Sequence, residues 1–323
     1  LLNGAVLGGV NLERVDLNGA SFKRVDLSGA SFDEAQLAGA DLSHANLSGA
    51  SLKHSVLKDA NLTSANLTGA DLTGADLSDA LLREAKLNEA LLLGVTLDGA
   101  DLCGVFWKGA TFKPASMKGA KAPSAPLATM EGGRLELEGA DLSGANLSEA
   151  RLKGLTLESL TLTNARGEGV DLSQLTVAHL SAAGLNLPNA NLSGVSWLGA
   201  NLSGAHLEGA TLNGARLDRA NLNRAQLTKA KLSEASLLEA NLEGAQLTEA
   251  TLRHATLSAA HLEGAHLERA NLSNANLQVA HLKEAKLGGA DLTNADLTGA
   301  QLPSVDLTAA TLEGANFTEA NLD

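Results

Sequence analysis

The chain has 323 residues, of which 44% are apolar but only 2% aromatic, and its formal net charge is −13 at pH 7. The excess of 37 acidic over 24 basic residues argues against direct binding of nucleic acid, whose phosphates attract basic proteins. No apolar run approaches the roughly 18 residues of a membrane span, no signal peptide is visible, and the single Cys103 excludes an intramolecular disulfide, so we expect a cytoplasmic protein.

A five-residue repeat begins in the first residues and keeps one phase along the whole chain. Its large apolar centre falls at positions whose numbers end in 2 or 7, and 53 of these 65 centres are Leu. A small residue lies two positions before each centre and is Ala in 48 of 64 units. Residues two apart point to the same side of an extended backbone, so both positions should face the interior. The other positions carry mostly polar residues and should face solvent.

The period of five excludes an amphipathic helix. Successive centres would lie about 140° apart around a helix and would never form one face. Of the 33 Gly, 28 lie two residues after a centre, which suits the second central residue of a type II turn, where φ is positive. The repeat therefore predicts short extended segments joined by tight turns, without helix.

The repeat is clearest between Ala60 and Asp79, which reads ANLTS ANLTG ADLTG ADLSD. These units resemble the pentapeptide-repeat family, whose consensus is A-D/N-L-x-x. The resemblance implies an all-β fold, a right-handed quadrilateral parallel β-helix with about 20 residues per coil. We expect residues 1–323 to form a single β-helix within a longer chain, because neither Leu1 nor Asp323 belongs to a capping element.

The regular pattern degrades first in an irregular belt at about 106–136. Pro114, Pro123 and Pro126 lie close together there, and proline cannot donate a hydrogen bond to a strand ladder. The phase is the same on both sides of the belt, so any excursion spans a multiple of five residues. The sequence leaves open whether residues 113–136 form a loop or a regular coil.

A softer region follows at about 155–187. Leu occupies several of its small positions, including 160 and 180, while Gly167 and Ala182 occupy centres. Large and small residues have partly exchanged places, which predicts compensated packing in a coil of changed cross-section.

The chain shows no arrangement typical of catalysis, and we expect neither an enzyme nor a cofactor. Its outward carboxylates follow the repeat, whereas acid–base catalysis needs a pocket and a shifted pKa. His261 and His281 are 20 residues apart and should stack in consecutive coils, but no third metal ligand falls in their column. That column also carries Asn and Gln, so a ladder of stacked polar side chains is expected there rather than a metal site.

An acidic face is expected on the side of the coil centred on Leu17. It suggests a basic or DNA-binding protein partner, although its charge is sparse beside that of duplex DNA. The acidic residues assigned to this face are Asp16, Asp76, Asp79, Asp98, Glu136, Glu138 and Glu158.

A separate partner-binding site is expected in the irregular belt. Phe106 is an aromatic residue at an outward position, and several lysines cluster beside it in an otherwise acidic chain. Binding residues concentrate on irregular segments held by a rigid scaffold. The residues assigned to this site are Phe106, Lys108, Lys113, Lys118 and Lys121.

Two functions follow from the resemblance. The first is a non-enzymatic rigid scaffold for protein–protein interaction, such as a module of a larger bacterial regulatory or secretion-linked protein. The alternative is a DNA-mimic protein that binds DNA gyrase or another topoisomerase and protects or inhibits it. The sequence identifies neither the partner nor the oligomeric state.

Overall fold

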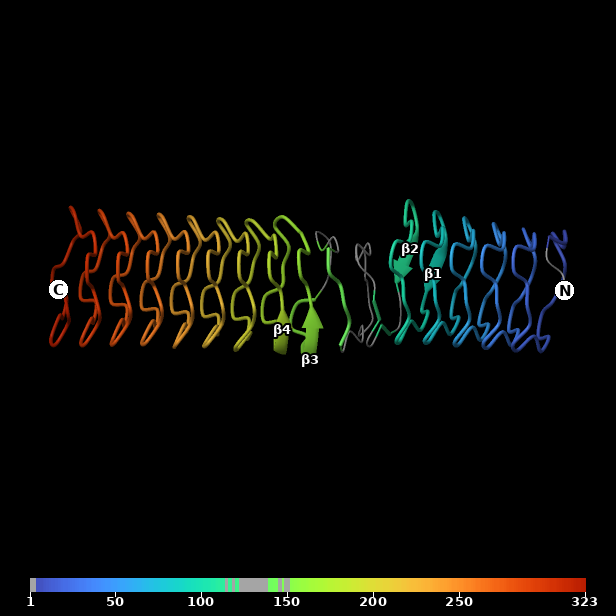
Figure 1. The fold of residues 1–323 in the computed structure, drawn as a ribbon, viewed down its shortest axis with the longest axis horizontal. Coiled ribbons are helices and arrows are strands. Elements are labelled where there is room, and N and C mark those ends of the chain that lie inside the picture. The colour runs from blue at the N-terminus through green and yellow to red at the C-terminus, as the bar shows by residue number, and fades with distance from the viewer. Residues whose placement is uncertain (1–3, 114–115, 118–119, 122–138, 145–146, 148–151) are drawn as a thin grey trace. The chain divides into compact units, whose positions relative to one another are not determined.

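The computed structural model describes residues 4–113, 116–117, 120–121, 139–144, 147 and 152–323. The chain divides into two compact units, Leu1–Ala145 and Asn146–Asp323. Within each unit the backbone winds into stacked coils, and parallel bridges join residues 20 positions apart (Figure 1). Four five-residue units therefore complete one coil. The described residues contain no helix, and so none that could cross a membrane.

Hydrogen bonds between coils follow the five-residue period. Where a described coil follows, the N–H of a centre typically donates to the carbonyl 19 residues ahead, as Leu27 does to Asn46 at 2.7 Å. The residue before the centre donates to the preceding coil, and the residue two after the centre donates to the following one. The small residue closes a turn onto the carbonyl of its own centre, as Ala30 does onto Leu27 at 3.1 Å. Four of the five amides in a unit are thereby paired by backbone alone.

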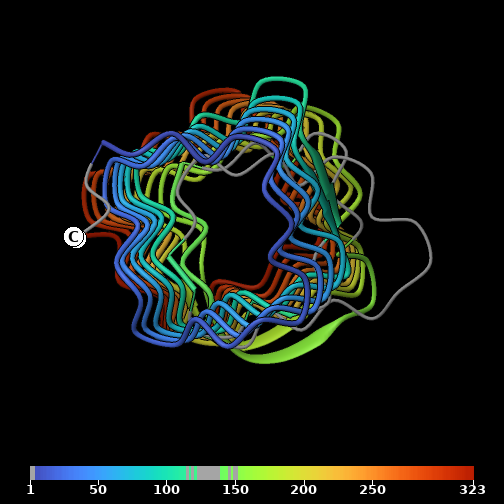
Figure 2. The same cartoon turned by 90° about the vertical axis from the view of Figure 1, so that its right-hand side faces the viewer.

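The turns are of the type that the Gly spacing predicts. The residue two after the centre has positive φ, which ranges from 61° to 76° where it is Gly. Other residues also adopt this conformation in many units, from His44 at 58° to Val279 at 51°. Seen along the stack, the turns of each unit lie at corresponding places in successive coils (Figure 2).

The core is a ladder of Leu and Ala side chains. From Leu27 to Leu102 in the first unit, and from Leu162 to Leu302 in the second, the centres are buried, and the apolar side chains among them are at most 1% exposed. Leu and Ala therefore occupy the interior positions that the repeat predicts, and the polar residues between them form the outer wall.

Two pairs of short parallel strands extend the bridges. In the first unit, β1 (Leu91–Leu93) pairs with β2 (Thr111–Lys113). In the second unit, β3 (Thr156–Thr161) pairs with β4 (Thr176–Ser181), and both strands run through a place where a turn is expected.

The turns replaced by β3 and β4 lie in the predicted softer region. Leu160 and Leu180 occupy small positions and are buried, at 2% and 4% exposed. The interior thus accepts the larger side chains at these two small positions. Leu175 also occupies a small position yet keeps its turn, so a Leu at this position does not by itself remove a turn.

Candidate functional site

The outer wall is built around the one amide in each unit that the backbone leaves unpaired. This is the N–H of the residue after the centre. Asp or Asn before the centre accepts it: Asp291 Oδ1 lies 3.0 Å from the Thr293 amide and 2.6 Å from the Thr293 hydroxyl oxygen. This bond is a physical reason for Asp or Asn at the second position of the consensus, because a buried or half-buried amide without a partner is costly.

The same contacts set the charge state of the wall. The hydroxyl of Thr293, and then its amide, donate to Asp291 and hold the pKa of this carboxyl below its ordinary value. Thr298 acts in the same way on Asp296, and Thr308 on Asp306. Many outward carboxylates are therefore part of the fold, with their ionised form stabilised by turn hydrogen bonds.

In five units of the described chain, the acceptor comes from the preceding coil instead. The residue before the centre in these units is Gln, Ser, Phe or Lys. An Asn or Asp 20 residues earlier then accepts the same amide, at 2.8–3.1 Å. The donor and acceptor pairs are Ala38 to Asn18, Lys53 to Asp33, Lys108 to Asn88, Ser233 to Asn213 and Leu238 to Asp218.

The predicted partner-binding residues are described only in part. Phe106 is 54% exposed, and its backbone forms a β-bridge with Lys86 of the preceding coil. Lys108 is exposed in the same five-residue unit. Lys121 is also exposed but lies in another column of bridges, between Asp101 and Asp141. Phe106 and Lys108 are thus brought together, while Lys121 stands on a different side of the coil.

Two further residues assigned to this site fall outside the description. Lys118 and the side chain of Lys113 are not among the described parts of the belt. The same holds for most of residues 113–136, so whether they form a loop or a coil also lies outside it.

The predicted acidic face includes residues with structural contacts. Asp16 accepts the amide of Asn18 at 3.1 Å, and Asp76 accepts both the amide and the hydroxyl of Ser78 at 3.0 and 2.6 Å. Asp98 accepts a hydrogen bond from the hydroxyl of Ser116.

The other acidic residues are placed differently. Asp79 is exposed in a turn, with φ of 58°. Glu158 belongs to the second unit, where its carboxylate lies 3.6 Å from the His179 ring. Glu136 and Glu138 lie outside the described residues.

The predicted imidazole stack is present in the second unit. The rings of His261 and His281 are 4.8 Å apart between centroids and 8° from parallel. Glu263, two residues after His261, brings a carboxylate oxygen to 3.3 Å from His261 Nδ1. Glu263 lies outside the column of His261 and His281, on the other side of the buried Leu262, so the sequence predicted no third ligand there. The His–Leu–Glu spacing is the sequence signal that could have found it.

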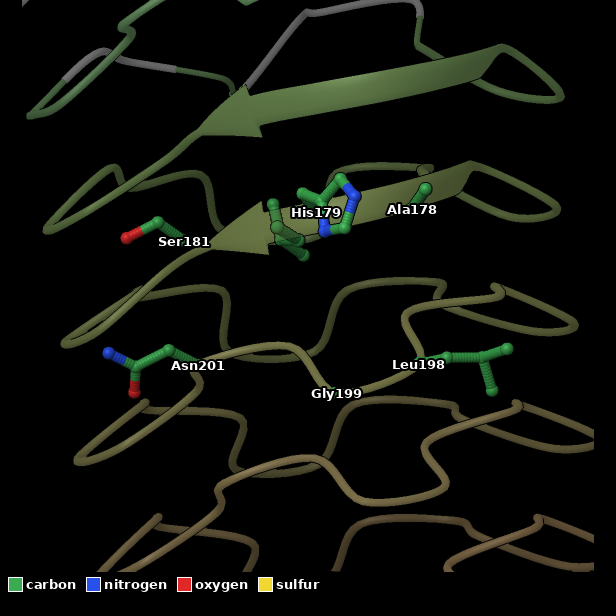
Figure 3. A pocket seen from close by; sticks show the side chains of 7 residues that line it. Ala178, His179, Ser181, Leu198, Gly199 and Asn201 are labelled. Atoms are coloured by element: carbon green, nitrogen blue, oxygen red, sulfur yellow. The ribbon is translucent and has the colours of Figure 1, made fainter.

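Hollows on the wall of the second unit are open and shallow. One is lined by Asn241, Glu243, His261 and Glu263, beside the imidazole stack. Another lies where β4 runs straight past the turn of the next coil at Leu198–Gly199. Figure 3 shows His179 of β4 and Leu198 of the next coil among the residues that line this second hollow.

Comparison with solved structures finds repeat proteins of the same kind. HetL, a pentapeptide repeat protein involved in heterocyst differentiation regulation from the cyanobacterium Nostoc sp. Strain PCC 7120, is 25% identical with a TM-score of 0.17, and the alignment covers 97% of this chain and 90% of HetL. QnrB1, a plasmid-mediated fluoroquinolone resistance protein, is 18% identical with a TM-score of 0.27, over 57% of this chain and 89% of its own. Rfr23 from the cyanobacterium Cyanothece 51142 is 30% identical with a TM-score of 0.18, over 40% and 91%.

No curated protein matches the chain. The family described as "Pentapeptide repeats" does, over residues 1–33, 35–105, 136–174 and 186–323. The matched segments cover most of the chain and share the repeat that forms the core and caps the turns. The chain belongs to the pentapeptide repeat family.

Proposed function

We propose that this protein is a non-enzymatic rigid scaffold that binds another protein through the surface around Phe106 and Lys108. The right-handed, four-sided winding known in the family is part of this proposal, because it gives each side of the coil a straight outer wall. Repeat proteins bind partners over such extended surfaces, and their repeats need no separate pocket to do so.

The replacement of a turn cap by Phe106 carries the proposal. Phe106 occupies the position where Asp or Asn would accept the amide of Lys108, and Asn88 of the preceding coil accepts it instead at 3.0 Å. The fold therefore retains its hydrogen bond while an aromatic side chain stands 54% exposed. Aromatic residues are enriched at the centres of protein interfaces, whereas charged residues are more common at their rims.

The charge states of the wall support a binding role over an enzymatic one. Where the described carboxylates depart from their ordinary pKa, the change is downward. A general acid at neutral pH needs the opposite change, toward a raised pKa.

The spacing of the acidic residues favours the scaffold over a DNA mimic. Asp16 and Asp76 lie in one column with Gln36 and Val56 between them, so they are three coils apart. At about 4.8 Å per coil this is roughly 14 Å, whereas duplex DNA carries one charge per about 1.7 Å of axis. Both aspartates also accept hydrogen bonds from their own turns.

Quantitative affinity capture tests the proposal. The full chain, the double variant F106S/K108E and the matched control L81S would be immobilised, and the captured proteins measured by mass spectrometry. Leu81 is an outward apolar residue at the same position of its unit and is 44% exposed. A partner retained by L81S and lost by the double variant is expected. Equal capture by all three chains would refute this surface.

A supercoiling assay separates the two functions. The scaffold predicts that DNA gyrase activity is unchanged by the protein, with or without a fluoroquinolone. Inhibition of the enzyme, or its protection from the drug, would favour the DNA mimic.

A further inference from the structure

Three five-residue repeats within Asn146–Asp323 share a His–Leu–Glu sequence and the same local contact. In each, the His before the buried centre and the Glu after it lie side by side on the outer wall. The distances from Nδ1 to Oε1 are 3.4 Å for His206 and Glu208, 3.3 Å for His261 and Glu263, and 3.4 Å for His266 and Glu268. Each pair offers one imidazole and one carboxylate.

The three pairs differ in what the neighbouring coils place beside them. His206 forms β-bridges with Asn186 and Gln226, which are weak metal ligands. His266 forms a β-bridge with Lys286, whose Nζ lies 3.4 Å from Nε2 of the His266 ring. His261 forms a β-bridge with a second histidine, His281, and the rings of these two histidines stack on each other. Among the three pairs, only that of His261 and Glu263 has a second imidazole, that of His281, beside it.

We propose that His261, Glu263 and His281 form a binding site for a divalent transition metal, with Zn²⁺ as the representative ion. One ligand atom from each residue lies within 4.8 Å of the others. Tetrahedral Zn²⁺ has bonds of about 2.0–2.2 Å, which place ligand atoms roughly 3.3–3.6 Å apart. The side chains must therefore close by about 1 Å.

The wall allows this closure without moving the backbone. The stacked rings have parallel in-plane lone pairs, so one ring must turn about its side-chain bonds to point its nitrogen toward the metal. The side chain of His261 is 51% exposed and is free of core packing. Both backbones are held in register by bridges from His261 to Asn241 and His281, and from His281 to Gln301.

The surroundings suit a cation. Glu243 of the preceding coil lines the same hollow as His261 and Glu263, and contributes a second carboxylate to its field. The nearby cation Lys283 lies 3.6 Å from the Glu284 carboxylate, so its charge is partly balanced within its own coil. Two imidazoles and one carboxylate are ligands that Zn²⁺ accepts, with a position left for water.

Calorimetric titration with ZnCl₂ tests the site on the full chain without a histidine tag. We expect one tight site in the parent, and affinity at least about tenfold weaker in H281N, since loss of even an outer partner of a ligand costs about 10–100-fold. H261N and E263S should weaken binding likewise. H261N reproduces the preceding coil, where Asn241 accepts the amide of Glu243 at 3.0 Å. E263S reproduces the residue after the centre in other units, such as Ser203, whose amide Asn201 accepts at 3.2 Å.

H206N is the matched control, because His206 has a glutamate neighbour but no second histidine. It should leave the tight site unchanged. Co²⁺ titration adds a readout of coordination: the parent should develop visible absorption bands that H281N lacks. The proposal is overturned if the parent binds Zn²⁺ no more tightly than H281N, or if H206N weakens binding as much.

Discussion

Asn88 Oδ1 accepts a hydrogen bond from the backbone amide of Lys108, one coil further along the chain, at 3.0 Å. Where Asp or Asn precedes the centre, this amide is capped from within the unit by that residue, as Asp291 caps Thr293. Here the residue before the centre is Phe106, and the cap has moved to the preceding coil. The position before the centre therefore does not need Asp or Asn in this unit, because the Lys108 amide has its acceptor in Asn88.

We expect N88A to destabilise the first unit by about 0.5–1.5 kcal/mol, the net value of one hydrogen bond, because the Lys108 amide loses its acceptor. Amide exchange at Lys108, followed by NMR or mass spectrometry, should become faster. N88D keeps an acceptor oxygen and should behave like the parent.

A second substitution makes this test specific. F106N places an acceptor within the unit of Lys108 itself, as in the consensus. N88A/F106N should therefore recover the protection that N88A loses, while F106N alone has little effect. Additive losses in the double variant would contradict the capping account.

The sequence predicted the core because period and burial coincide. Leu222 and Ala220 illustrate this: both are at repeat positions assigned to the interior, and they are 1% and 0% exposed. The turns could also be predicted from the sequence, since Gly marks the residue with positive φ. The straight strands β3 and β4 could not be predicted, because Leu175 also places Leu at a small position, as Leu160 does, and yet keeps its turn.

The candidate sites depend on contacts between side chains of different columns. The 20-residue spacing predicts neighbours within one column and does not predict such contacts. Asp76 looks like a surface charge in the sequence, yet its oxygen is engaged by Ser78. Glu263 looks remote from His281, yet it reaches the imidazole stack across a buried centre. In both cases the side chain turns along the wall, a direction set by rotamers rather than by spacing.

Leu222 tests the interior assignment. L222D should lower the free energy of unfolding by more than about 4 kcal/mol, because it places an unpaired carboxylate in an apolar column. L222M should cost less than about 1.5 kcal/mol, since volume is conserved. N221D puts the same charge on the outer wall one residue away and should be tolerated. Urea denaturation of the three variants decides the matter, and a stable L222D would contradict the fold.

The turn aspartates predict a particular response to acid. The pKa of Asp291, Asp296 and Asp306 is lowered by hydrogen bonds that exist in the folded state. The stabilisation from their ionised forms is present above the unfolded pKa near 3.9 and is lost as pH falls through the lowered pKa. D291N/D296N/D306N keeps the acceptor oxygens but removes the titration. Its Tm should fall less than that of the parent between about pH 7 and pH 3. Parallel pH profiles would contradict this role.

Val279 offers a test of strain in the turns. It is β-branched, it has φ of 51°, and its Cγ1 lies 3.1 Å from the place where a Cβ on Gly299 would stand. Left-handed backbone costs a residue of this kind roughly 1–3 kcal/mol, which exceeds the entropy of about 0.5–1 kcal/mol that glycine adds to the unfolded chain. V279G should therefore raise stability, by about 1 kcal/mol.

Ala259 is the matched control for Val279, because it occupies the same turn position one coil earlier with φ of 53°. Alanine has no branch at Cβ, so A259G should gain less than V279G. G299A should destabilise the protein, because it adds both a strained φ and a contact with Val279. Thermal unfolding of the three variants measures the order. If V279G lowers the Tm, the turn holds Val279 without strain and its side chain contributes more to the wall than its backbone costs.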